Sequence, residues 1–159
     1  MGTRSAIGVI HGDKAKVVYC HWDGYLDHNG RILLEHYDSA KANHLVALGG
    51  ISSLDRNIEI PEGVEHTFDK PAKGITVFYD RDRGEDANKY VVCFSDAEMY
   101  EHFSWCEYFY IMRDGVWYVS QGPGTEWKEL SVALAELDIE NAEDALPNES
   151  VLIKQLVGA

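Results

Sequence analysis

Two pairs of alternating, strand-like runs, each joined by a turn signal, constrain the fold of this chain more than any other feature. Residues 105–113 and 116–120 flank Asp114-Gly115, a dipeptide typical of a two-residue β-hairpin turn. Residues 3–11 and 14–21 flank Gly12-Asp13 in the same way. Hairpins join neighbouring antiparallel strands, whereas parallel strands need long crossover connections. The chain is therefore predicted to form a mainly antiparallel sheet built from hairpins.

Helical signals follow the first hairpin. Asn29 is expected to cap a short helix over residues 31–37, and Asp38 or Ser39 to cap a second helix over residues 40–48. Two glycines directly after residue 48 are typical of a helix end.

The middle of the chain combines an irregular stretch with further strands. Residues 51–74 contain two prolines and two glycines and are predicted to be largely irregular. Strands are expected over residues 75–79 and 89–94, and a capping box of Ser95 and Glu98 begins another helix. This order predicts a single α+β domain, with helices packed on one face of the sheet.

The last part of the chain is strongly acidic. Residues 126–149 hold eight acidic side chains against one lysine, and leucines at helical spacing predict an amphipathic helix, with a final turn or two over 151–157. The sequence therefore predicts a domain over residues 1–123 and an acidic helical C-terminal extension over 124–159. Its charges either form a solvated face or imitate nucleic acid toward a basic partner.

Composition excludes several classes of protein. The net charge of −13 argues against direct nucleic-acid binding, which needs basic surface. The absence of a long apolar run or a secretory signal predicts a cytoplasmic protein without a membrane span. Three cysteines without a C-x-x-C pair predict buried thiols, and seven histidines without a ligand-type spacing predict no metal. Without nucleotide-binding glycine motifs, no cofactor is expected.

Residues 19–37 are the most unusual stretch, because a strand-like run ends there in rings, carboxylates and glycine. Loops on a rigid scaffold commonly carry function. Histidine beside a carboxylate can act as a general base, and indole or phenol rings can stack on a nucleobase. Alternatively, the rings anchor the core and the histidines cap strand and helix ends. The candidate ligand-binding residues are His21, Trp22, Asp23, Tyr25, His28 and Arg31, and the catalytic set of an enzyme would be His21, Asp23 and His28.

A second candidate is the charged segment 80–86, which is expected to be a loop. Its Arg81 and Arg83 carry planar guanidinium groups that suit phosphate or carboxylate, and Arg4 adds another at the start of the first strand. One interpretation places Arg81 and Arg83 with the rings of residues 19–37 in one binding pocket. The other pairs the arginines with local acids, where each exposed pair contributes about 0–1 kcal/mol.

Several motifs in order resemble a family of small proteins encoded by bacteriophages and prophages. They are Thr3-Arg4-Ser5, YCHWDGY at 19–25, HNGRILLEHY at 28–37, ISSL at 51–54, EHTFD at 65–69 and FYDRDRGED at 78–86. The resemblance covers about residues 2–120 and implies a short cytoplasmic protein of a family whose role is mostly unassigned. Family members more often have proline where this chain has Leu26, and the acidic tail is an addition.

Three functions are compatible with this setting. The first is an accessory counter-defence or host-takeover protein that sequesters a nucleotide-type small-molecule signal. The second is an acidic inhibitor or nucleic-acid mimic that binds a host defence protein. The third is a phosphoester hydrolase that uses His21 or His28 with Asp23. Binding is favoured over catalysis because the chain carries no second catalytic signature, and a homo-oligomer is left open.

Overall fold

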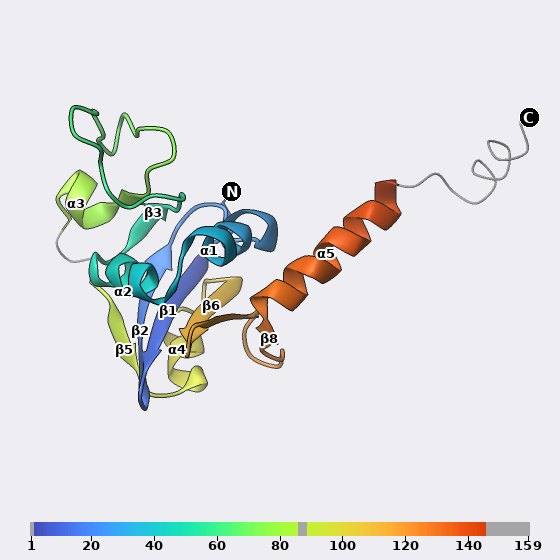
Figure 1. Cartoon of the computed structure of the whole chain (residues 1–159). Helices are drawn as coiled ribbons and strands as arrows, with labels where there is room; N and C mark the ends of the chain where they lie inside the picture. Colours follow the sequence, from blue (N-terminus) through green and yellow to red (C-terminus); the bar gives the residue numbers. More distant parts are fainter. Residues whose placement is uncertain (1, 86–88, 146–159) are drawn as a thin grey trace, which may run out of the picture.

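The computed structural model describes residues 2–85 and 89–145, which form one α+β domain (Figure 1). The strands are β1 (Ser5–His11), β2 (Lys14–Cys20), β3 (Ile51–Ser53), β4 (Val77–Phe78), β5 (Val91–Cys93), β6 (Tyr108–Arg113), β7 (Val116–Ser120) and β8 (Lys128–Glu129). The helices are the π-helix η1 (Leu26–Gly30), α1 (Arg31–His36), α2 (Ser39–Ala47), α3 (Tyr79–Arg83), α4 (Asp96–His102) and α5 (Leu130–Ala145).

The eight strands form one mixed sheet in the order β4-β3-β2-β1-β6-β7-β8, with β5 also on β2. Both predicted hairpins are present: β1 pairs with β2, and β6 with β7. The two hairpins are joined because β1 runs parallel to β6, and β2 is also parallel to β3. The other pairings are antiparallel, so the prediction of a mainly antiparallel sheet is confirmed.

Apolar residues on both faces of the central strands divide the core into two layers. Ile7 and Val18 face the layer that contains buried residues of α1, α2 and α5. Their neighbours Ala6 and Val17 point the other way and pack with Met99 of α4. Figure 1 shows α1 and α2 lying across one side of the sheet. Helices therefore cover both faces, and the expectation of a single covered face is too simple.

Two local predictions are wrong. Asn29 does not cap a helix: it lies within η1, which runs directly into α1, and its side chain is fully buried. The first part of the segment predicted as a charged loop belongs to helix α3, which ends at Arg83 and is followed by Gly84 with a φ of 81°. Its acids lie in the first turn and its arginines in the last, the arrangement that favours a helix electrostatically.

The caps predicted at Asp38 and Ser95 are present.

Helix α5 begins inside the domain and ends outside it. Leu130 and Leu134 are buried in the core, and β8, just before the helix, pairs with β7. The second half of α5 projects from the body (Figure 1). Residues 128–137 therefore contribute to the packing of the domain, although they follow the predicted boundary at residue 123. The final turn expected over residues 151–157 lies outside the described residues.

The three cysteines are free and buried, as the sequence predicts. Burial raises the pKa of the Cys20 and Cys106 thiols to about 12, so both are protonated and unreactive at neutral pH. None of the helices within residues 2–85 and 89–145 has the length and apolar character needed to cross a bilayer.

Candidate functional site

Segment 21–30 is fixed to the sheet by the buried amide of Asn29. Its Nδ2 lies 3.3 Å from Ser5 Oγ, 3.3 Å from Cys20 Sγ and 3.2 Å from the carbonyl oxygen of Trp22, and its two N–H groups are shared among these three acceptors. These three acceptors belong to β1, β2 and the residues just after β2. The segment after β2 is thus held in one conformation by a single side chain.

Two close backbone approaches complete this anchor. The Gly24 N–H donates to the Thr3 carbonyl at 2.7 Å, and the Tyr110 hydroxyl donates to the Gly24 carbonyl at 2.6 Å. A Cβ atom at Gly24 would lie 2.7 Å from the Ser5 Cβ, so only glycine fits here. Asp23 turns the chain with a φ of 55°.

Beyond this anchor, aromatic rings follow one another across the end of the sheet, on the face that carries α4. The ring centroids of Trp105 and Tyr19 lie 6.0 Å apart, those of Tyr19 and His21 5.9 Å, and those of His21 and Trp22 4.6 Å. Trp22 and Trp105 are 44% and 47% exposed, although indoles are usually well buried. We call these four residues the ring row.

Arg4 is the cation of the ring row. The β1–β2 ladder ends at the pair of Ser5 and Cys20, which Arg4 and His21 directly adjoin along the chain, and the charge of Arg4 lowers the pKa of His21. Arg4 is exposed, and within the described residues its side chain forms no hydrogen bond or ion pair. Its charge is therefore available to an anion from solvent.

His21 in the ring row is a neutral side chain with one ring nitrogen already engaged by the protein. Burial raises the pKa of Tyr19 to about 12, and burial together with Arg4 lowers the pKa of His21, so both groups are neutral near pH 7. The Tyr19 hydroxyl and His21 Nδ1 share a hydrogen bond of 2.7 Å. Nε2 of the ring has no hydrogen-bond partner among the described residues and is therefore available to a ligand.

The arginine segment reaches the same face through one strand. The Trp22 N–H bonds to the carbonyl of Ser52 in β3, and the Ser52 side chain hydrogen-bonds Tyr79, the first residue of α3. The Tyr79 ring lies 5.8 Å from the Phe68 ring, which in turn lies under the guanidinium of Arg83. Arg83 also pairs with Glu85 at 2.8 Å. Arg83 is therefore engaged by Phe68 and Glu85, and no contact within the described residues joins it to the ring row.

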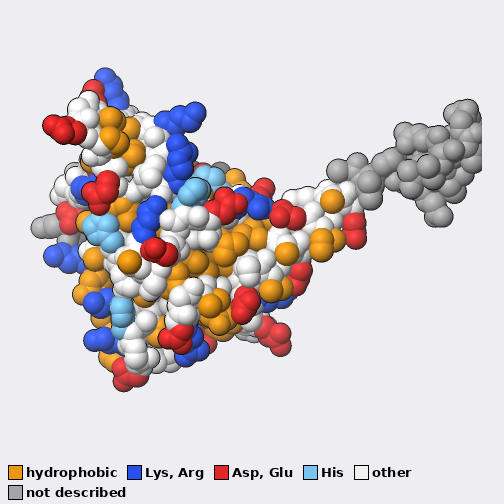
Figure 2. Space-filling model, in the orientation of Figure 1, with side chains coloured by type: hydrophobic (Ala, Val, Ile, Leu, Met, Phe, Trp, Pro, Cys, Tyr) orange, Lys and Arg blue, Asp and Glu red, His pale blue; other side chains and the backbone are white. Residues whose placement is uncertain are grey.

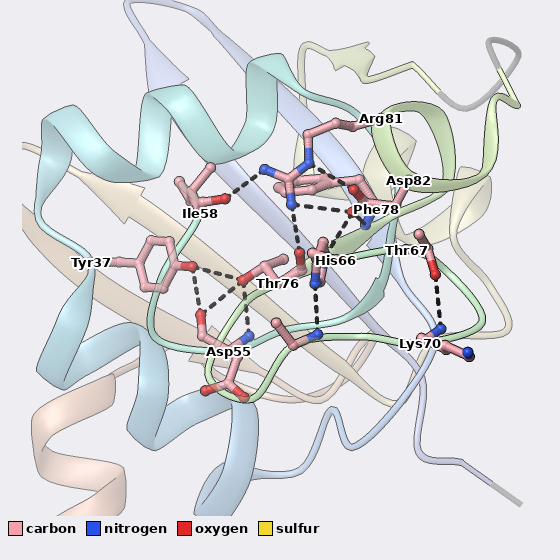
Figure 3. A network of polar contacts seen from close by, with 11 residues as sticks. Tyr37, Asp55, Ile58, His66, Thr67, Lys70, Thr76, Phe78, Arg81 and Asp82 are labelled. Atoms are coloured by element: carbon pink, nitrogen blue, oxygen red, sulfur yellow. Dashed lines mark hydrogen bonds and ion pairs between the residues drawn. The ribbon is translucent and has the colours of Figure 1, made fainter. Parts of the chain in front are cut away.

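Arg81 is directed inward instead. It donates to the carbonyl oxygens of Ile58 and Thr76 and to the carboxylate of Asp82 (Figure 3). Asp82 also accepts the Phe78 N–H at 2.8 Å, and its Oδ2 lies 3.3 Å from Nε2 of the buried His66. The two atoms are close enough for an ion pair, but they are not aligned for a hydrogen bond, so His66 Nε2 has no hydrogen-bond partner among the described residues. These bonds hold the irregular stretch 55–76 on α3.

The remaining predicted residues lie on η1 and α1. Arg31 pairs with Asp27 and with Asp138 of α5. His28 donates from Nδ1 to Asn29 Oδ1 at 2.9 Å, because the Asn29 amide nitrogen serves other acceptors, and the exposed Tyr25 ring lies beside it. In the part of the chain that the structure describes, no hydrogen bond or ion pair joins His21, Asp23 and His28 side chains, so the hydrolytic set is not assembled by side-chain contacts.

Eight of the nine sequence-based candidates divide into three groups, and the ninth, Asp23, forms the turn after β2. Arg4, His21 and Trp22 come together, and Tyr25 and His28 form a separate pair. The third group is engaged by protein partners and consists of Arg31, Arg81 and Arg83. Sequence reasoning missed Tyr19 and Trp105. Tyr19 could have been found, because strand alternation places it on the same side of β2 as His21. No group of three or more metal-ligating side chains occurs among the described residues.

Comparison of the chain with protein-family models, with curated proteins and with solved structures finds no match. The interpretation of the site therefore depends on its geometry and on the chemistry of its side chains.

We predict that Asn29→Ala lowers the free energy of unfolding by about 2–3 kcal/mol, because Ser5 Oγ and the Trp22 carbonyl lose their buried donor. Urea unfolding measures the change. Asn43→Ala is the matched control, since Asn43 is not fully buried and donates one exposed bond to the Ser39 carbonyl. An equal loss in both variants would contradict the anchoring role of Asn29.

We predict that Asp82→Asn costs about 3–5 kcal/mol of unfolding free energy, because it leaves Arg81 without its carboxylate partner in a largely buried site. Asp80→Asn, on the same helix and without a described side-chain partner, should change stability by less than about 0.5 kcal/mol. Limited proteolysis of the stretch 55–76 reports the local effect. If that stretch resists proteolysis equally in Asp82→Asn and in the parent protein, Arg81 and Asp82 do not hold it on α3.

Proposed function

We propose that this protein is a bacteriophage accessory factor that acts by binding, and that it sequesters a nucleotide-type small molecule on the ring row. The observation that carries the proposal is the row itself: two half-exposed indoles lie at either end of the Tyr19–His21 pair, and the exposed Arg4 is close enough to lower the pKa of His21. Rings of this kind stack on nucleobases, and the Arg4 guanidinium suits a phosphate. The phage setting is the one implied by the sequence motifs.

The local charge of the ring row differs from the net charge of the chain. The chain carries a net charge of −13, so a phosphate would be repelled by most of it. At the ring row, by contrast, a phosphate meets the unpaired positive charge of Arg4 and the neutral ring of His21. A small anion that stacks on the rings therefore meets favourable charge only locally, which suits a compact ligand better than an extended nucleic acid.

Binding is favoured over hydrolysis for a chemical reason. A general base needs a free ring nitrogen that can take up a proton. Nδ1 of His21 is engaged by the Tyr19 hydroxyl, and no carboxylate among the described residues pairs with its ring. A role in ligand recognition uses this neutral ring as it stands, whereas base catalysis would lack the carboxylate that orients and stabilises a protonated imidazole.

Calorimetric and thermal-shift titration with mononucleotides, cyclic dinucleotides and ADP-ribose derivatives tests the proposal. Trp105→Ala should weaken binding of the active ligand by about 1–3 kcal/mol through lost stacking, and Arg4→Gln should weaken phosphate-bearing ligands selectively. Lys73→Gln and Tyr90→Ala serve as controls, because they remove an exposed cation and a partly exposed ring elsewhere.

Absence of any thermal shift or heat across this panel would reject ligand sequestration. Turnover of a bound ligand that His21→Ala abolishes would instead favour the phosphoester hydrolase. Binding that is insensitive to both Trp105→Ala and Arg4→Gln would place the ligand elsewhere on the molecule.

A second function is favoured by α5. Glu140 and Glu143 lie on its exposed, projecting half, and neither forms an ion pair within the described residues. Such a surface suits an acidic inhibitor that docks on a basic face of a host defence protein. Figure 2 shows acidic side chains spaced along this helix, with apolar side chains between it and the body.

We predict that Glu140→Gln combined with Glu143→Gln abolishes counter-defence activity in infected cells if α5 is the active surface, while stability is unchanged. Truncation after residue 123 is unsuitable for this test, because it removes the buried Leu130 and Leu134. Asp138 and Glu136 are avoided because they pair with Arg31 and Lys128. Full activity of the double variant would reject the acidic-mimic function and leave ligand binding as the mechanism.

A further inference from the structure

A hollow of about 350 Å³ lies at the opposite end of α4 from the ring row, under the turn of the β1–β2 hairpin. Ile10, Ala15, Met99 and Ile111 form its apolar floor. Small-molecule pockets in proteins have volumes of roughly 300–1,000 Å³ and are mainly apolar with a few placed polar groups. The hollow therefore has the size and the floor of a site for a small ligand.

Two aromatic side chains line this hollow. Phe94 is 61% exposed, which is unusual for the most apolar of the rings and leaves its surface uncovered within the described part of the chain. Trp127 is held in place, because its Nε1 donates to Asp96 Oδ2 at 3.0 Å and its ring stacks on Tyr100 with centroids 6.2 Å apart. The walls can thus contact a flat ring.

Two cations reach the same hollow from different strands. Lys14 begins β2 and Arg113 ends β6, and neither side chain has a hydrogen-bond or ion-pair partner among residues 2–85 and 89–145. Two carboxylates also line the hollow. Asp96 is engaged by the Trp127 N–H, whereas Asp13 lies exposed in the hairpin turn. The unengaged charges of the hollow are therefore two positive and one negative.

We propose that this hollow binds a small organic anion with a flat apolar body, such as an aryl carboxylate or sulfonate. The body would lie on the floor between Phe94 and Trp127, and the acid group would meet Lys14 and Arg113. A neutral ligand would leave both cations without a partner, and a polyphosphate would leave the apolar floor exposed to water. This site is separate from the ring row and does not depend on the nucleotide proposal.

Fluorescence titration with 8-anilinonaphthalene-1-sulfonate tests the proposal, with N-phenyl-1-naphthylamine as the neutral probe of nearly the same shape. The expected result is one sulfonate site per chain. Lys14→Gln combined with Arg113→Gln should raise the Kd of the sulfonate at least tenfold and leave that of the neutral probe unchanged. Lys70→Gln combined with Lys73→Gln is the control pair of exposed lysines and should change neither.

A second variant locates the probe in the hollow. Ala15→Leu adds bulk to the floor and should weaken both probes at least tenfold, with circular dichroism used to check that the fold is kept. Equal sulfonate affinity in the parent protein and in the Lys14/Arg113 variant, several equivalent sites per chain, or no binding at all would overturn the proposal. Failure of the nucleotide panel would leave this result unaffected, so the two proposals are separable.

Discussion

The buried amide of Asn29 is the interaction on which the arrangement of the candidate site depends. Its three acceptors lie on β1, on β2 and just beyond β2, so one side chain ties the end of η1 to the two central strands. Gly24 packs against Ser5 where a Cβ atom would clash, and the Tyr110 hydroxyl of β6 donates a hydrogen bond to the Gly24 carbonyl. An amide is suited to this position because it carries two donors and an acceptor on one rigid plane, and its acceptor is used by His28.

Helix α4 organises the opposite face of the sheet. It covers Ala6, Val17 and Phe109 in the middle of the face and leaves both ends open. The ring row occupies the end near its C-terminus, and the hollow occupies the end near its N-terminus. A short helix on a long sheet thus produces two separate surfaces with different chemistry: donors and half-exposed rings at one end, an apolar floor with two cations at the other.

The sequence predicts the framework of the fold well, because hairpins and caps are local. The predicted turn at Asp114-Gly115 joins β6 to β7, and the predicted caps at Asp38 and Ser95 begin α2 and α4. Prediction from sequence fails where a contact with a distant part of the chain determines the local structure. Asn29 resembles a helix cap, but its amide is drawn to acceptors on strands 9 and 24 residues away in the chain. Arg81 resembles a ligand-binding residue, but nearby carbonyls in the folded chain take its donors. The parallel pairing of β1 with β6, which joins the hairpins, has no local signal at all.

The edges of the sheet bear on how a partner protein could be recognised. The outermost strands in the sheet order, β4 and β8, are two residues each, and the outer side of β2 is divided between β3 near one end and β5 near the other. A strand from a partner protein can pair with a sheet edge only along a run of unpaired backbone N–H and C=O groups. Edge strands of two residues offer too few of these groups. Recognition by strand addition is therefore disfavoured over these edges. Partners of this protein, whether a small molecule or a macromolecule, would be selected by side chains on its faces and on α5, so that point substitutions there should alter specificity without disturbing the sheet.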